Sequence, residues 1–244
     1  REEGEVLRRY CHVGTGNYNP KTARFYDDLG IISSEPALGE DLSRLFNELS
    51  GYSAKHDYSR ILVAPHSLRK GLLAKITREK KNHLEGKTAW IRLKLNSLLD
   101  EEIIAALYEA ADAGVKIEII VRGICALQFS TQAQRENIKV RSILGRFLEH
   151  SRIYYFKNDG AEEYYIGSAD VMHRNLDRRV EALVRIDLEK HKERLRKILD
   201  DSVSDSYSTW ALLEDNNWQR KVRDFDGNLL VNFQDHFVEK HNRA

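Results

Sequence analysis

The residue types best suited to chemistry are concentrated in one stretch, residues 145–179. His150 precedes a short apolar run, and Gly167 and Ser168 follow about one hairpin later. The stretch closes with an asparagine and three arginines: Asn175, Arg174, Arg178 and Arg179. Imidazole can exchange a proton near neutral pH, and a guanidinium binds phosphate oxygens through paired hydrogen bonds. A potential nucleophile, small residues and fixed cations in one unit predict a site for phosphoryl transfer.

Further polar residues lie where strands are expected to end. Arg122 follows the apolar segment 117–121, and Lys94 and Asn96 end the alternating segment 89–95. Ligands of open α/β sheets bind outside the carboxyl ends of the strands, so these side chains are candidates for the same pocket. The alternatives are a surface arginine for Arg122 and a solvated strand end for Lys94 and Asn96.

The N-terminal stretch repeats part of this pattern. HVGTGNYNPKTARFY (12–26) and YIGSADVMHRNLDRR (165–179) each carry Gly-Thr or Gly-Ser at a strand end, followed by asparagine and arginine. His150 lies 17 positions before Gly167, and the same interval counted back from Gly14 passes the first residue of the chain. If the stretches are copies, the first histidine lies upstream, and Asn17 and Asn19 belong to its site. The alternative is a common turn after a strand.

Composition limits the kinds of site that the chain can carry. The 244 residues are 41% hydrophobic and 32% charged with a net charge of +1, so a polyanion site must come from a local convergence of cations. Cys11 and Cys125 show neither metal-ligand spacing nor a disulfide framework. No apolar run approaches the ~20 residues of a membrane span, and the charged start shows no signal peptide. We expect a cytoplasmic segment of a larger protein without a metal site of its own, and peripheral membrane association stays open.

Hydrophobic periodicity predicts an α/β fold whose mixed or mostly parallel sheet is covered by helices on both faces. The expected strands are Ile61–Ala64, Ala89–Leu95, Lys116–Val121, Val140–Leu144, Ser151–Phe156, Tyr164–Gly167 and Val180–Ile186. The expected helices between them run from Ser67 to about Leu84, from Asp100 to Gly114 and from Asp187 to about Leu199.

The two ends of the chain are expected to be built differently. Before residue 50 we expect a strand over 6–13, a short helix over 22–29 and an amphipathic helix over 40–49. The polar tail, residues 202–244, carries scattered aromatic residues and is expected to form helices packed on the body.

Five blocks of the sequence together resemble the C-terminal part of bacterial polyphosphate kinases, in order over roughly residues 5–200. They are HVGTGNYNPKTARFYDDL, KLNSLLD, VRGICAL, VRSILGRFLEH and GSADVMHRNLDRRVE. The resemblance implies tandem phospholipase D-like domains, each a mixed sheet flanked by helices. Residues 1–35 would then be the remnant of the first domain, 36–55 a helical linker, 56–200 the second domain and 201–244 a helical extension.

The resemblance also implies an activity: reversible transfer of the terminal phosphate of ATP to inorganic polyphosphate through a phosphohistidine. The family's phosphoacceptor histidine belongs to a Lys-Thr-His-Ala-Lys-type motif that this sequence lacks. We therefore expect that histidine, and the ligands of Mg²⁺, to lie upstream. The implied partners are ATP or ADP, polyphosphate, the rest of the same polypeptide and further copies in a homo-oligomer, without nucleic acid.

Individual roles follow from the same resemblance. His150 is the second-domain histidine, which protonates a phosphate oxygen or stabilises the phosphohistidine. Arg122 and Arg179 match phosphate ligands, and Tyr26 matches a tyrosine that contacts adenine. The remaining candidates for binding or lining the site are Arg174, Lys94, Asn96, Asn17, Asn19, Arg152 and Ser168. An ordinary packed histidine and a core aromatic residue stay open as alternatives for His150 and Tyr26.

Two other functions fit parts of the sequence. A phospholipase D-type phosphodiesterase or nuclease requires a His-x-Lys pair, whereas this chain has His150-Ser151-Arg152. Gly167-Ser168 is also followed by Ala169-Asp170, which argues against a generic phosphodiesterase. A module that binds ATP or polyphosphate without turnover is the expectation for the isolated chain.

Overall fold

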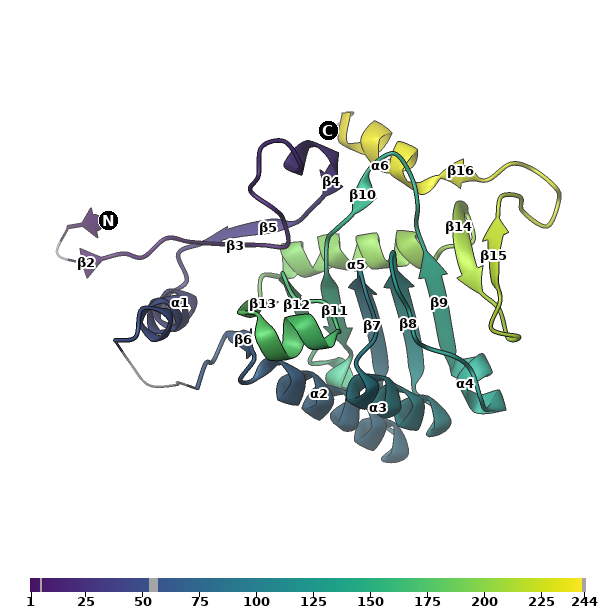
Figure 1. Ribbon diagram of the computed structural model, residues 1–244, viewed down its shortest axis with the longest axis horizontal. Coiled ribbons are helices and arrows are strands. Elements are labelled where there is room, and N and C mark those ends of the chain that lie inside the picture. Colours follow the sequence, from purple (N-terminus) through teal and green to yellow (C-terminus); the bar gives the residue numbers. More distant parts are fainter. Residues whose placement is uncertain (5, 53–56, 243–244) are drawn as a thin grey trace.

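The computed structural model describes residues 1–4, 6–52 and 57–242. Within these residues, ten strands form a central mixed sheet in the order β15-β14-β9-β8-β7-β11-β12-β13-β6, with β16 joined to β14 (Figure 1). The parallel strands are β7 (Trp90–Leu95), β8 (Lys116–Val121) and β9 (Ile138–Ser142). The strands that continue the sheet antiparallel to their neighbours are β11 (Ile153–Phe156), β12 (Glu163–Gly167), β13 (Glu181–Ile186) and β6 (Ile61–Ala64). The expected α/β fold with a mixed sheet is confirmed.

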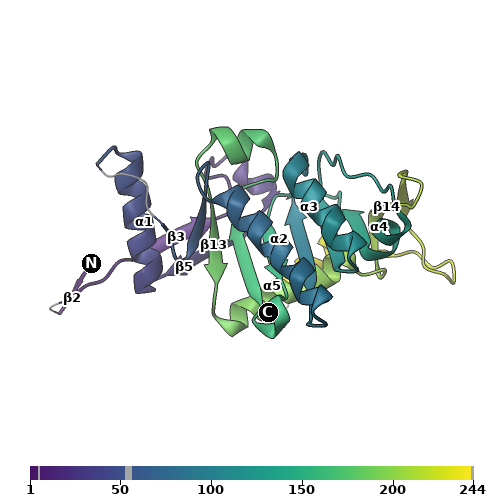
Figure 2. The ribbon, with the colours of Figure 1, turned by 90° about the horizontal axis from the view of Figure 1, so that it is seen from below.

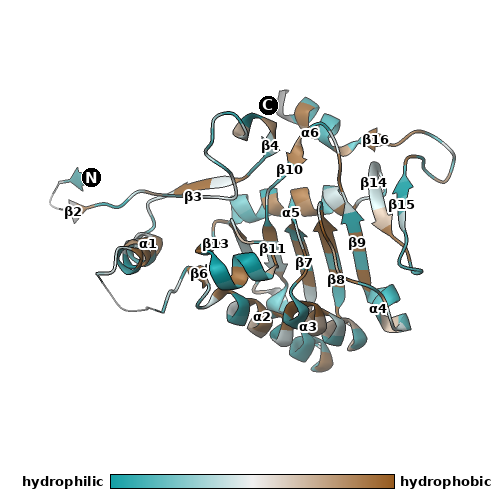
Figure 3. Ribbon diagram, in the orientation of Figure 1, coloured by the Kyte–Doolittle hydropathy of each residue, from teal (hydrophilic) through white to brown (hydrophobic). Residues whose placement is uncertain are grey.

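Helices cover both faces of the sheet. α2 (Leu68–Leu84) and α3 (Glu101–Asp112) lie on one face, and α5 (Glu189–Val203) lies on the other (Figure 2). Because alternate residues of a strand point to opposite faces, Tyr154 packs in the core under α2 and α3, and Tyr155 packs in the core under α5. Hydrophobic residues are concentrated in β7, β8 and α3 (Figure 3).

The N-terminal part forms short paired segments beside the sheet. β1 (Glu2–Glu3) pairs with β2 (Val6–Leu7), and β3 (Cys11–Gly14) pairs with β5 (Gly30–Ser33), ahead of α1 (Pro36–Leu49). Two strands thus replace the one expected over 6–13. The expectation of a helix over 22–29 is wrong. A single 3-10 turn, Ala23–Phe25, is followed by β4 (Tyr26–Asp27), which pairs in parallel with β10 (Leu148–Glu149). Pairing with this distant strand overrides local helix propensity.

The C-terminal tail also differs from the expected helices. β14 (Tyr207–Leu212) extends the sheet at β9, and β15 (Trp218–Lys221) and β16 (Val231–Asn232) pair with β14. β14 buries alternate residues, Thr209 and Ala211, as a half-buried strand does. The open edge of β9 supplies its hydrogen-bonding partner, so the helical expectation for 201–244 is correct only for α6 (Phe233–Asn242) and for the end of α5.

The remaining elements are short. α4 (Gln132–Asn137), which was not expected, begins at a capping box formed by Thr131 and Gln134. A 3-10 turn spans Asn158–Gly160, and a π-helical turn spans Arg174–Arg178. The expected boundary between residues 55 and 56 lies outside the described residues. Of the helices described, none has the length and hydropathy to cross a membrane.

Glu163 on β12 joins the sheet to α2. Its carboxylate accepts hydrogen bonds from Lys75 Nζ at 2.8 Å and Arg78 Nη1 at 3.0 Å, and the side chain is buried. Burial alone would raise the pKa of this carboxyl, but the bonds from Arg78 and Lys75 lower the pKa from 4.5 to about 2. A carboxyl whose pKa is lowered by folding stabilises the folded state at every pH above its ordinary pKa. This contribution is lost as the pH falls from 4.5 to about 2.

We therefore expect Glu163→Gln to lower the free energy of unfolding by about 3 kcal/mol at neutral pH. In urea unfolding, the difference from the unchanged protein should shrink as the pH falls from 4.5 to about 2. Glu102→Gln, on the exposed side of α3, is the control and should have little effect. A difference for Glu163→Gln that does not change with pH would contradict this account.

Candidate functional site

A cavity of about 510 Å³ opens beyond the carboxyl ends of β7 and β8. The loops that follow these strands contribute Asn96 and Arg122, and the N-terminal segment contributes Thr15 and Asn17. The other polar residues that line it are Tyr18, Ser97, His150, Arg152, Ser168, Asp170, Arg174, Asn175, Arg179 and Glu181. Segments far apart in the sequence thus bring one histidine and four arginines to a single cavity.

His150 is held from several sides. Its Nδ1 lies 2.8 Å from Asp28 Oδ1, its backbone N–H donates to the carbonyl of Asp27 at 3.1 Å, and the Tyr26 ring packs on it with centroids 4.7 Å apart. Arg152 Nη1 lies 3.2 Å from both ring nitrogens. The contact with Asp28 favours a proton on Nδ1, which leaves Nε2 to exchange a proton with a ligand.

Asp28 is a residue that the sequence did not single out. Burial by itself would raise the pKa of Asp28, but hydrogen bonds from His150 and Thr15, together with the charge of Arg152, lower it. The carboxylate therefore stays ionised and orients the imidazole, as an acidic partner does for a histidine that moves protons. Asp28 and His150 are 122 positions apart, so no local spacing could have revealed the pair.

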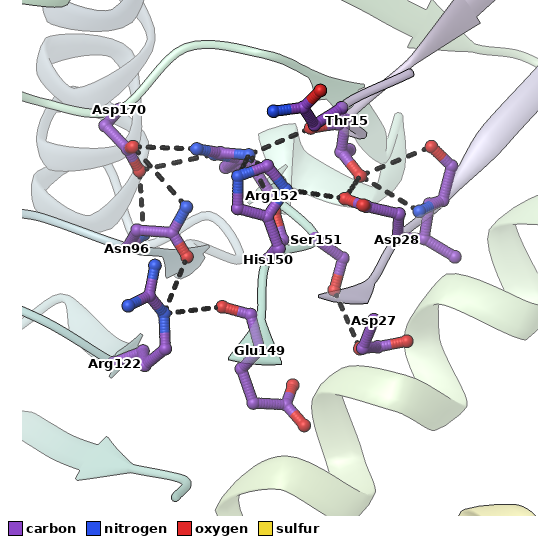
Figure 4. A network of polar contacts seen from close by, with 12 residues as sticks. Thr15, Asp27, Asp28, Asn96, Arg122, Glu149, His150, Ser151, Arg152 and Asp170 are labelled. Carbon is purple, nitrogen blue, oxygen red and sulfur yellow. Dashed lines mark hydrogen bonds and ion pairs between the residues drawn. The ribbon is translucent and has the colours of Figure 1, made fainter. Parts of the chain in front are cut away.

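A buried network supports the floor of the cavity (Figure 4). Arg152 Nη2 donates to Asp170 Oδ2 at 2.9 Å, and Arg152 Nη1 donates to the carbonyl oxygens of Thr15 and His150. Asp170 also accepts from the backbone N–H of Asn96 at 2.7 Å. Both side chains of the ion pair are less than a tenth exposed, so Arg152 is a fixed cation with limited freedom to move toward a ligand.

Arg122 is better placed to bind a ligand. Its Nε donates to the carbonyl of Glu149 at 2.8 Å, which fixes the plane of the guanidinium. In the described part of the chain, its two terminal nitrogens make no hydrogen bond. Burial lowers the pKa of Arg122, and the group remains charged because an arginine is not deprotonated near neutral pH. A fixed cation with free N–H groups can bind phosphate oxygens.

Arg174 begins the π-helical turn and Arg179 directly follows it at the rim of the cavity, and both are exposed. Arg178, between them, does not line the cavity. Two contacts hold the turn in place: Arg69 donates to the Asp177 carboxylate, and Asn175 Nδ2 donates to Glu181 at 2.6 Å. The rim therefore carries two exposed cations on a fixed base.

Three candidates from the sequence lie outside the cavity lining. Lys94 is buried, and its Nζ lies 2.8 Å from Glu149 and 2.7 Å from Ser151 Oγ, so it supports the residues on either side of His150. Its expected place in the pocket is wrong because a buried ammonium requires a counter-charge, which Glu149 supplies. Tyr26 contacts the His150 ring, and Asn19 closes a turn by accepting from the Lys21 N–H. Asn17, Asn96, Arg152 and Ser168 do line the cavity.

The fold and the cavity define an α/β protein with a cationic, histidine-containing pocket of the kind that binds phosphate groups. The family model described as polyphosphate kinase C-terminal domain 2 matches residues 61–232, and domain 1 of the same name matches residues 1–55. The chain belongs to the polyphosphate kinase family.

Individual relatives agree with this assignment. A polyphosphate kinase from Streptomyces coelicolor is 52% identical over 243 residues, which cover 100% of this chain and 33% of that protein. One from Mycobacterium avium is 48% identical over 99% of this chain and 32% of its own length. The crystal structure of polyphosphate kinase from Porphyromonas gingivalis superposes with a TM-score of 0.88 at 33% identity, covering 100% of this chain and 38% of that one. The chain thus spans about a third of the length of the curated relatives it matches.

Proposed function

We propose that the full-length protein transfers the terminal phosphate of ATP reversibly to inorganic polyphosphate, and that this chain forms one half of the cleft in which the transfer occurs. The observation that carries the proposal is the convergence of His150 with Arg122, Arg174 and Arg179 on one cavity of a polyphosphate kinase family member. Phosphoryl transfer requires positioning and the neutralisation of charge on the phosphate oxygens. The arginines supply the positive charge that neutralises the phosphate oxygens, and they differ in how firmly they are held.

In this proposal His150 moves a proton and is not the nucleophile. The nucleophile is a histidine upstream, in the two thirds of the relatives' length that this chain does not cover. His150 Nε2 of the imidazolium gives a proton to the oxygen that leaves or bridges, which leaves a neutral imidazole. Asp28 stabilises the imidazolium before the transfer and keeps the neutral ring oriented through Nδ1 after it. The free N–H groups of Arg122 bind the nucleotide phosphates. The partners are ATP or ADP, polyphosphate, the upstream part of the polypeptide and further copies of the protein.

In this proposal Mg²⁺ binds together with ATP and not to residues of this chain. Asp170 and Glu181, which line the cavity, already bind Arg152 and Asn175, and Asp28 beside it binds His150. In the described ranges no cluster of histidine, cysteine and acidic residues suits a metal ion. These residues do not fit a magnesium site, and we assign the protein ligands of Mg²⁺ to the upstream region.

The test uses the full-length protein with ATP, Mg²⁺ and a short polyphosphate primer. We expect ADP to form in step with chain elongation, and ATP to form from ADP and polyphosphate in reverse. With labelled ATP, an acid-labile phosphohistidine should appear on the full-length protein, whereas the 244-residue chain alone should carry no label. Phosphodiester hydrolysis without polymer formation would overturn the proposal.

Arg122→Ala should weaken ATP binding more than it slows the chemical step. A hydrogen bond to a charged group contributes about 1.5–3 kcal/mol, so the KM for ATP should rise about 10- to 100-fold. Steady-state kinetics with varied ATP measure the change. Arg178→Ala, which removes an exposed arginine outside the cavity, is the matched control. Equal KM values for the two variants would exclude Arg122 as a phosphate ligand.

A further inference from the structure

The C-terminal helix reaches the segment that carries His150. Gln234, the second residue of α6, is 4% exposed, and its amide lies against residues 145–149. Its Oε1 accepts from the backbone N–H of Phe147 at 2.7 Å, and its Nε2 donates to the Phe147 carbonyl at 2.8 Å. Nε2 also donates to Glu149 Oε1 at 2.8 Å. Both amide hydrogens and the amide oxygen are therefore used.

These contacts continue to the residues on either side of His150. Glu149 Oε2 lies 2.8 Å from Lys94 Nζ, and the same ammonium donates to Ser151 Oγ at 2.7 Å. In an extended segment, alternate side chains point to opposite sides. Glu149 and Ser151 thus turn inward to one lysine, and His150 between them faces the cavity.

The segment needs this support because its own pairing is short. β10 contains two residues, Leu148 and Glu149, whose partners are Tyr26 and Asp27 of the equally short β4. The Gln234 amide binds both the N–H and the C=O of Phe147, as the backbone of a neighbouring strand would. It thus holds the residue directly before β10, which has no partner in β4. α6 is itself anchored, because Phe233 is buried and packs against the Tyr207 ring at a centroid distance of 5.7 Å.

We propose that Gln234 is a positioning residue that fixes the place of His150 in the cavity, which gives the C-terminal extension a role in the reaction. The inference rests on the proposed function, because His150 needs exact placement only if it moves a proton. Gln234 touches neither the cavity nor His150, and it lies beyond residue 232, where the match to the family model ends. A displacement of about 1 Å in a reacting group can slow a reaction about 100-fold.

The test replaces Gln234 with methionine in the full-length protein, which keeps the length of the side chain and removes its hydrogen bonds. We expect kcat for polymer synthesis to fall about 10- to 100-fold, with the KM for ATP changed less than about threefold because the rim arginines are untouched. Hydrogen exchange of residues 145–150 should become faster, since the Phe147 N–H loses its acceptor. Gln219→Met, at an exposed position of β15 in the same extension, is the matched control and should change neither quantity.

A second variant, Gln234→Glu, covers the case in which Gln234→Met does not fold. It keeps an acceptor for the Phe147 N–H, but it replaces both donated bonds with repulsion from the Glu149 carboxylate and the Phe147 carbonyl. It should therefore lower kcat at least as much as Gln234→Met, with less effect on exchange at Phe147. Unchanged kcat in either folded variant, or unchanged exchange in a folded Gln234→Met variant, would overturn the inference. Equal losses in kcat and in ATP affinity, with faster exchange throughout the sheet, would show a merely structural role. If the full-length protein without any substitution makes no polymer, the proposed function is wrong. The hydrogen exchange of residues 145–150 would still report whether Gln234 holds that segment in place.

Discussion

Replacing His150 with alanine in the full-length protein is expected to lower kcat for polyphosphate synthesis by about 10²- to 10⁴-fold, the usual contribution of a positioned acid or base. The fold should survive, because the ring lies at the edge of the cavity and is partly exposed. The loss should affect synthesis and its reversal alike, since both directions pass through the same transition state. Initial rates of ADP formation with saturating ATP measure the effect.

The structure offers a close control for this change. His66 also pairs with a carboxylate, since its Nε2 lies 3.1 Å from Glu48, but it does not line the cavity. His66→Ala should therefore leave kcat within about twofold, as expected for a substitution outside the site. If His150→Ala retained near-normal synthesis, the histidine would have no part in the chemistry, and the cavity would be a binding site alone.

The sequence predicted the central strands because their hydrophobic pattern is regular, but it could not predict that the charged residues within one of them are buried. β7 alternates apolar residues with Arg92 and Lys94, which normally indicates one solvated face. Both charged side chains are instead buried, and Arg92 pairs with Glu118 on β8 and with Asp200 on α5. A charge that meets its partner only after folding cannot be distinguished in sequence from a solvated one.

The two ends of the chain were mispredicted for a related reason. Tyr26–Asp27 and Tyr207–Leu212 are strands because β10 and β9 provide their hydrogen-bonding partners. Neither segment shows a strong local preference, so the tertiary contact decides the structure. The same holds for the site. His150 and the arginines can be named from residue type and resemblance. Asp28 contacts His150 from 122 positions away and Gln234 contacts Phe147 from 87 positions away, so the sequence alone does not reveal either contact.

The largest expected effect on stability comes from Asp170→Ala. The change leaves the Arg152 guanidinium, 7% exposed, without its carboxylate, and it removes the acceptor of the Asn96 backbone N–H. Breaking a buried ion pair from one side costs about 3–5 kcal/mol, because an uncompensated charge stays buried. Urea unfolding should show this loss, whereas Asp226→Ala on an exposed loop should stay within about 0.5 kcal/mol of the unchanged protein. A loss below about 1 kcal/mol would mean that water or the carbonyls of Thr15 and His150 already satisfy the guanidinium.

A double variant separates the structural part of this network from its chemical part. Asp170→Ala combined with Arg152→Met removes both charges, and replacing a buried ion pair with apolar groups is often close to neutral. We therefore expect the double variant to recover much of the stability that Asp170→Ala loses, as a coupled pair does in a double-mutant cycle. Activity should stay low, because Arg152 Nη1 lies 3.2 Å from both ring nitrogens of His150 and its charge is lost. Recovery of both stability and activity would mean that the buried pair only fills space beneath the cavity.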